Sequence, residues 1–148
     1  MSMNLEFSFH AYVAIGKSLE IGQVPTGFRS IVPITGGKFE GQLNGVVIPG
    51  GADWQLIRND GIMEVEARYT LKTDDGILIY IVNKGMINLD EAYARTSPKF
   101  EVSDEKYAWL SESMFVSEIT PMENETTPIV DEKNPKPNGV SINFYRIT

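Results

Sequence analysis

The sequence predicts an all-β protein, and more narrowly a small, mostly antiparallel β-barrel of about 8–10 strands with at most one short helical turn. Apolar and polar residues alternate along several segments, which is the pattern of a half-buried strand. Gly-containing turn signals at 59–61, 74–76 and 138–139 interrupt these segments at short intervals. Helical periodicity is weak throughout. Because closure removes exposed sheet edges, a barrel is favoured over an open sandwich.

Alternation locates the strands in order. The first is expected from Leu5 to Val13, where odd positions are apolar and even positions mainly polar. A three-stranded meander is expected at 53–58, 62–73 and 77–84, joined by the turns at 59–61 and 74–76. Its last strand is apolar on both faces from Ile77 to Val82, which indicates a central strand covered on each side.

Further strands are expected at 107–119 and 140–147, and the one helical candidate is a short turn at 89–94. Between the last two strands, the segment from about 120 to 138 is rich in Pro and Glu, and we expect it to be an exposed loop. With 148 residues, the chain is expected to form one domain that spans 1–148.

Composition limits the chemistry that the protein can use. The chain has no Cys and one His, so a disulfide, a thiolate zinc site, a Cys nucleophile and a two-histidine metal site are excluded within one chain. A formal charge of −7 argues against nucleic-acid or anionic-membrane partners. Asp74-Asp75-Gly76 is interpreted as a hairpin turn rather than a metal loop. We therefore expect no metal, no cofactor and a site made of Asp, Glu, Arg and Tyr.

The N-terminus shows no cationic start followed by an apolar run, so no signal peptide is predicted. The longest apolar run, 77–82, is far shorter than the roughly 20 residues of a membrane helix. These features predict a cytoplasmic protein.

Asp53 is the first candidate for catalysis. It follows a Gly-rich bend, where it can act as a general base at a barrel mouth or accept backbone N–H groups as a turn residue. Turn hydrogen bonds would lower its pKa and make it a poor base, whereas burial beside Trp54 would raise the pKa. Both interpretations stay open.

Arg68, Tyr80 and Glu101 complete the tentative catalytic set. Arg68 can stabilise a developing oxyanion if its strand face points into a polar lumen, or can belong to a surface ion-pair ladder. Tyr80 is either a core tyrosine whose hydroxyl is satisfied or a proton donor that lines a cavity, and Tyr69 has the same two interpretations. Glu101 is an alternative base.

Four further residues are candidates for ligand binding. Aromatic side chains next to charged ones are typical of a pocket for a polar organic molecule, although an Arg–Glu clamp over a loop gives the same pattern. The four are Trp54, Arg95, Tyr107 and Trp109, of which Trp54 is alternatively a core Trp and Tyr107 alternatively a core tyrosine whose hydroxyl is satisfied.

Several motifs resemble a known family. They are the segments Arg29–Gly41, Gly45–Gln55, Ala67–Gly76, Asn83–Gly85, Arg95–Glu101 and Tyr107–Leu110. In this order they closely resemble uncharacterised protein family 0311, also called domain of unknown function 3237. The resemblance covers nearly the whole chain. It implies a small antiparallel β-barrel in a bacterial cytoplasmic protein, and it implies no established activity.

Three functions remain open from the sequence. The first is an acid/base enzyme of the isomerase, cyclase or dehydratase type that acts on a small polar-aromatic molecule. The second is a non-catalytic barrel that binds a small ligand. The third is a structural homo-oligomer, a dimer for example, in which another subunit shields Ile77–Val82.

Overall fold

The computed structural model describes residues 1–121 and 138–148, so most of the loop expected at 120–138 lies outside the described residues. Within the described ranges are nine strands and one short 3₁₀ helix. They are β1 (Leu5–Ile15), β2 (Leu19–Val24), β3 (Gly27–Gly41), β4 (Gly45–Arg58), β5 (Met63–Thr73), β6 (Leu78–Asn88), β7 (Tyr93–Glu101), η1 (Glu105–Leu110), β8 (Phe115–Pro121) and β9 (Asn138–Ile147).

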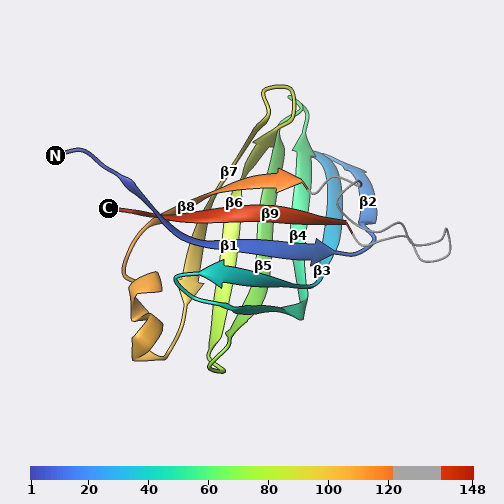
Figure 1. Ribbon diagram of the computed structural model, residues 1–148. Coiled ribbons are helices and arrows are strands. Elements are labelled where there is room, and N and C mark those ends of the chain that lie inside the picture. Colours follow the sequence, from blue (N-terminus) through green and yellow to red (C-terminus); the bar gives the residue numbers. More distant parts are fainter. Residues whose placement is uncertain (122–137) are drawn as a thin grey trace.

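The strands form a closed barrel, as the sequence predicts (Figure 1). Each of β3 to β8 pairs with its neighbour in the chain, β8 pairs with β9, and β9 pairs with β1. Pairing of β1 with β3 closes this ring of eight antiparallel strands, and β2 extends it as a hairpin partner of β3 alone. Closure satisfies the backbone groups that an open sheet would leave at its edges.

The longest strands bend at glycines. Gly37, with φ 143°, lies where β3 changes register against β4, and a Cβ there would come within 2.0 Å of the Tyr12 carbonyl oxygen. In β4, three residues, Pro49 to Gly51, occupy the space opposite Tyr69 alone. Such bulges increase the local twist and allow a long strand to curve around a barrel.

Aromatic residues fill one end of the barrel. The rings of Phe9 and Phe144 stack with centroids 4.3 Å apart, and Phe100 lies 6.0 Å from each. Phe115 meets Phe100 edge-on at 5.1 Å. All four side chains are buried, so we refer to them as the aromatic cluster.

Two local predictions are wrong. The strand expected at 107–119 begins only at Phe115, because Glu105–Leu110 forms η1, where the Asp104 side chain accepts the Lys106 N–H at 2.9 Å. The helical turn expected at 89–94 is a tight turn, and β7 begins at Tyr93.

The expected cover on both faces of Ile77–Val82 is also absent within the described chain. Ile79 and Ile81 point into the barrel and are fully buried, whereas Leu78 on the outer face is 59% exposed. A closed barrel has one interior, so its outer face meets solvent unless another molecule covers it. A dimer that shields this strand stays a prediction. Among the described residues, no helix is long and apolar enough to cross a membrane.

A polar clamp fixes η1 to the turn between β5 and β6. Asp75 accepts hydrogen bonds from Lys106 Nζ at 2.8 Å, from the Thr73 hydroxyl at 2.5 Å and from the Tyr107 hydroxyl at 2.8 Å. The bond from Lys106, followed by those from Thr73 and Tyr107, lowers the pKa of Asp75. The Asp-Gly turn therefore also anchors a distant segment.

This clamp predicts an acid-dependent loss of stability. Because the folded pKa of Asp75 is lowered, its contribution is complete above the usual Asp value of about 3.9 and is lost as pH falls through the folded pKa. We expect Asp75→Asn to lower Tm at pH 7 and the difference from the natural chain to shrink below pH 4. Circular-dichroism melts across pH would measure this, with the exposed neighbour Asp74→Asn as control. Equal Tm values at pH 7 would contradict the prediction.

Candidate functional site

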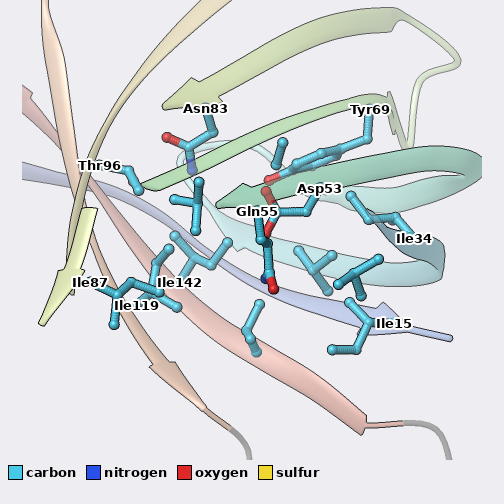
Figure 2. A pocket seen from close by; sticks show the side chains of 15 residues that line it. Ile15, Ile34, Asp53, Gln55, Tyr69, Asn83, Ile87, Thr96, Ile119 and Ile142 are labelled. Carbon is cyan, nitrogen blue, oxygen red and sulfur yellow. The ribbon is translucent and has the colours of Figure 1, made fainter. Parts of the chain in front are cut away.

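The end of the barrel opposite the aromatic cluster contains a cavity of about 70 Å³ (Figure 2). One water needs roughly 10–15 Å³ by the same kind of measure, so the cavity has room for a small molecule. The residues that line this cavity are the inward-pointing ones of the alternating strands. At this end of the barrel, inward positions of β4, β5, β6 and β7 carry polar side chains. Nearer the aromatic cluster, the inward positions of the same strands carry apolar side chains that fill the space.

The lining divides into two walls. A polar wall comes from four neighbouring strands, β4 to β7. Its members are Asp53, Gln55, Tyr69, Asn83 and Thr96. An apolar wall of Val and Ile comes largely from β1, β3, β8 and β9. It includes Val13, Ile15, Ile34, Ile119, Val140 and Ile142. Figure 2 shows Asp53 and Tyr69 on one side of the cavity and Ile15, Ile119 and Ile142 on the other.

Asp53 lies in the polar wall, partly buried. Its Oδ2 accepts the Gln55 side-chain amide at 2.9 Å, and its Oδ1 accepts the Glu66 backbone N–H at 3.0 Å. Burial raises the pKa of Asp53, and these two hydrogen bonds offset only part of the rise. The two effects expected from the sequence, hydrogen bonds that lower the pKa of Asp53 and burial that raises it, therefore both act, and burial has the larger effect. Trp54, however, is on the outer face and does not cause it.

Tyr69 and Asn83 are the most buried polar residues beside Asp53. Tyr69 is 3% exposed and Asn83 2%, yet neither the Tyr69 hydroxyl nor the Asn83 Oδ1 has a hydrogen-bond partner within the described residues. Burial, and secondarily the charge of Asp53, raises the pKa of Tyr69. In Figure 2 its hydroxyl points toward the Asp53 carboxylate. Since native proteins satisfy nearly all buried polar groups, a polar molecule in the cavity, whether water or a ligand, would supply the hydrogen bonds that these two atoms lack.

The other three tentative catalytic residues do not meet Asp53 in this cavity. Arg68 is on the outer face, where its Nη2 binds Glu66 Oε2 at 2.8 Å with the Arg68 side chain 47% exposed. Tyr80 is also on the outer face of β6 and lies opposite Glu101, an exposed residue of β7. The surface ion-pair interpretation of Arg68 fits this geometry. The strand face that carries it points away from the lumen because Val65, Ala67 and Tyr69 point inward.

The four expected ligand-binding residues are likewise outside the cavity lining. Trp54 is 37% exposed on the outer face, and the Arg95 guanidinium lies 5.4 Å from the centre of the Tyr93 ring. The Tyr107 hydroxyl is part of the clamp on Asp75. The ring centroid of Trp109 lies 6.2 Å from that of Phe115, at the end of the barrel that the aromatic cluster fills. Their ligand-binding roles stay predictions without support from this cavity.

The sequence offered a signal for the residues that do line the cavity. Tyr69 occupies the apolar register of β5, and Asn83 continues the inward register of Ile79 and Ile81. A polar side chain in an inward register is the expected mark of a lumen site. Among the described residues, no group of three or more His, Asp or Glu is placed to hold a metal ion.

A closed antiparallel β-barrel, with an acid, a tyrosine and an amide around an interior cavity, is the class of protein that these observations define. The chain belongs to the family described as "Protein of unknown function (DUF3237)", whose family model matches residues 3–147. This confirms the resemblance read from the motifs.

Two relatives match nearly the whole of this chain. A UPF0311 protein of Clostridium acetobutylicum is 33% identical, with 99% of this chain and 95% of the relative covered. A solved β-barrel-like protein from Acinetobacter baumannii has a TM-score of 0.85 at 29% identity and covers 100% of this chain and 98% of its own.

One relative has a name that states an activity. A protein of Penicillium herquei named "Hydroalkoxylation enzyme phnH" is 30% identical over 109 residues, which covers 73% of this chain and 68% of that protein. A solved structure of an enzyme from Penicillium herquei has a TM-score of 0.75 at 25% identity, with 100% of this chain and 96% of that chain covered.

Proposed function

We propose that the lumen is the active site of an acid/base enzyme that acts on a small organic molecule, with Asp53 as general base and Tyr69 as the group that stabilises developing oxyanion charge. The observation that carries the proposal is the Tyr69 hydroxyl, which is buried, has no hydrogen-bond partner among the described residues and is directed toward Asp53. A carboxylate whose pKa is raised by burial is a better base near neutral pH than an exposed one. Asn83 orients the substrate.

Within this class we favour cyclisation by addition of a hydroxyl across a conjugated C=C bond. Asp53 accepts the hydroxyl proton while the oxygen bonds to the β carbon of an α,β-unsaturated carbonyl. The electron pair of the C=C bond moves onto the carbonyl oxygen, where the Tyr69 O–H donates a hydrogen bond. Asp53 then returns its proton to the α carbon. The product is an isomer of the substrate, so atoms and electrons balance.

Two considerations support cyclisation over the other acid/base reactions. The Penicillium herquei relative is named for hydroalkoxylation, which is the addition of a hydroxyl across a C=C bond. A carboxylic acid is too weak to protonate an isolated alkene readily, so conjugation to a carbonyl, with Tyr69 at the oxygen, suits these residues better. The family label itself names no activity.

The test is a rate measurement on compact hydroxy-enones. Loss of the conjugated absorbance, with NMR of the product, would report cyclisation, and reaction in deuterated water would label the α carbon. We expect Tyr69→Phe to slow turnover by about 100-fold, the usual effect of losing one oxyanion donor. Tyr80→Phe is the matched control, because it removes a hydroxyl from the outer face of the adjacent strand. Equal losses in both variants, or no turnover by the natural chain, would contradict the proposal.

A non-catalytic binding barrel is the second candidate. The Val and Ile wall favours it, because these side chains can hold a ligand by apolar contact and have no group that takes part in a reaction. It predicts that hydroxy-enones bind in the lumen and are recovered unchanged, without deuterium at the α carbon.

A further inference from the structure

The two walls of the cavity restrict the chemical class of the ligand beyond the type of reaction. The polar groups come from the neighbouring strands β4 to β7, which also contribute Val65, Ala67 and Ile87, and the side formed by β1, β3, β8 and β9 is branched and aliphatic. A molecule bound between them has one polar edge and one apolar flank. With a volume of about 70 Å³, the cavity admits a compact body of on the order of half a dozen non-hydrogen atoms.

The hydrogen-bonding groups of the polar wall match a hydroxyl. The Tyr69 O–H is a donor that needs an acceptor, and the Asn83 Oδ1 is an acceptor that needs a donor. Both oxygens of Asp53 accept bonds from Gln55 and Glu66, and each keeps capacity for a further donor. A ligand hydroxyl donates one bond and accepts two, so it can serve Tyr69 together with either acceptor.

The wall also discriminates by charge. Among the described residues that line the cavity, none is Lys or Arg, and Asp53 is the one carboxylic acid. A carboxylate or phosphate would lose its hydration, meet no cation from these described residues and lie against a like charge, which is strongly unfavourable in a buried site. A cation could pair with the Asp53 carboxylate, but it would lose its hydration in a lumen lined mainly by Val and Ile and would leave the Tyr69 hydroxyl, a donor, without an acceptor.

We infer that the lumen takes an uncharged, hydroxyl-bearing molecule with a compact cyclic or branched aliphatic body, held with its hydroxyl against β4–β6 and its body against β1, β8 and β9. This inference rests on the proposed function for the location of the site. It adds the substrate class and orientation, and it excludes organic anions as substrates.

A matched probe series tests it. Cyclopentanol, cyclopentanone, cyclopentanecarboxylate and cyclopentylammonium share one ring and differ in the polar group. Binding to the ¹⁵N-labelled chain would be followed by amide chemical shifts at pH 7, where weak, millimolar affinities are measurable. We expect cyclopentanol to bind about threefold more tightly than the ketone, which has no donor, and at least about tenfold more tightly than either ion. The largest shifts should fall on β4–β6, β1 and β9.

A pair of variants connects the preference to Asn83. Asn83→Leu preserves size and removes the Oδ1 acceptor, so we expect it to reduce the preference for the alcohol over the ketone, with Asp53 left as the other acceptor. Asn143→Leu is the matched control, because Asn143 binds His10 and Glu118 through its side chain on the outer face of β9. It should keep the preference.

The outcomes separate this inference from the proposed function. Carboxylate or ammonium binding as tight as cyclopentanol, or an unchanged preference in Asn83→Leu, overturns the ligand class even where hydroxy-enones are turned over. Selective alcohol binding at these strands supports the ligand class even where turnover is absent. No shift in the lumen with any probe overturns the inference.

Discussion

Replacing Asp53 by Asn should lower turnover of a hydroxy-enone by about 100- to 10,000-fold, the range that a positioned general base contributes. Asparagine has the same shape and its Oδ1 can still accept the Glu66 N–H, and Gln55 can turn its amide so that its oxygen accepts from the new Nδ2, so the cavity and its affinity for an uncharged alcohol should change little. Turnover and cyclopentanol binding measured on the same preparation separate the two effects. Glu101→Gln is the control, since it neutralises an exposed acid on the outer face. An unaffected rate in Asp53→Asn would remove the base from the proposal.

The same carboxylate should set the acid limb of the pH–rate profile. Only ionised Asp53 accepts a proton, and burial raises its pKa above the usual value of about 3.9. Turnover should therefore begin to fall, as the pH is lowered, at a pH above that of an exposed Asp. Tyr69→Phe should lower the plateau and keep this limb, because its hydroxyl is not the base.

Stability provides an independent measure of Asp53. Because the folded state binds this proton more tightly than the unfolded chain, the stabilising contribution of Asp53 is complete below about pH 3.9 and is lost as pH rises through the raised folded pKa. Asp53→Asn should therefore have a higher Tm than the natural chain at pH 7 and a similar Tm near pH 3.5. An acid that favours function at the expense of stability is a common property of active sites.

Much of the barrel could be predicted because its signal is local. Alternation in β1, β5 and β9 and the Asp-Gly turn at 74–76 follow from the chemistry of neighbouring residues. The prediction of a strand at 107–119 was wrong because the contacts that decide this segment are not local. An Asp104 cap and a distant acid, Asp75, hold η1 in place, and no pattern within the segment reveals a partner so far along the chain.

The site was less predictable because it depends on which face of each strand points inward. Arg68 and Tyr69 are adjacent, and a single step of register exchanges their places between solvent and lumen. Aromatic and charged residues near bends favoured Trp54 and Arg95, although bends of a barrel also carry residues for the outer face. A single polar residue at an inward position of a strand whose other inward residues are apolar, such as Asn83 in β6, is a better indicator of a site inside the barrel.

The largest loss of stability is expected from Phe144→Ala, at the centre of the aromatic cluster. Phe144 is fully buried and contacts Phe9 and Phe100, so truncation removes apolar burial and leaves a cavity, with a cost of about 3–5 kcal/mol. For a chain of this size that lowers Tm by roughly 10 °C. Urea unfolding would give the free-energy change from the shift in midpoint. The control is Phe7→Ala in β1, a ring that is 46% exposed.

Phe144→Ala should also change what the lumen binds. Phe144 is two residues along β9 from Ile142, which lines the cavity, so the space left by its ring lies at the base of the apolar wall. An apolar space of this kind stays dry and accepts apolar molecules. We therefore expect benzene to raise the Tm of Phe144→Ala more than that of the natural chain, whose cavity of similar size has a polar wall. A loss of unfolding free energy below about 1 kcal/mol, or no effect of benzene on Tm, would show that the aromatic cluster collapses into the space. The end of the barrel that this cluster fills would then not be a rigid boundary of the cavity.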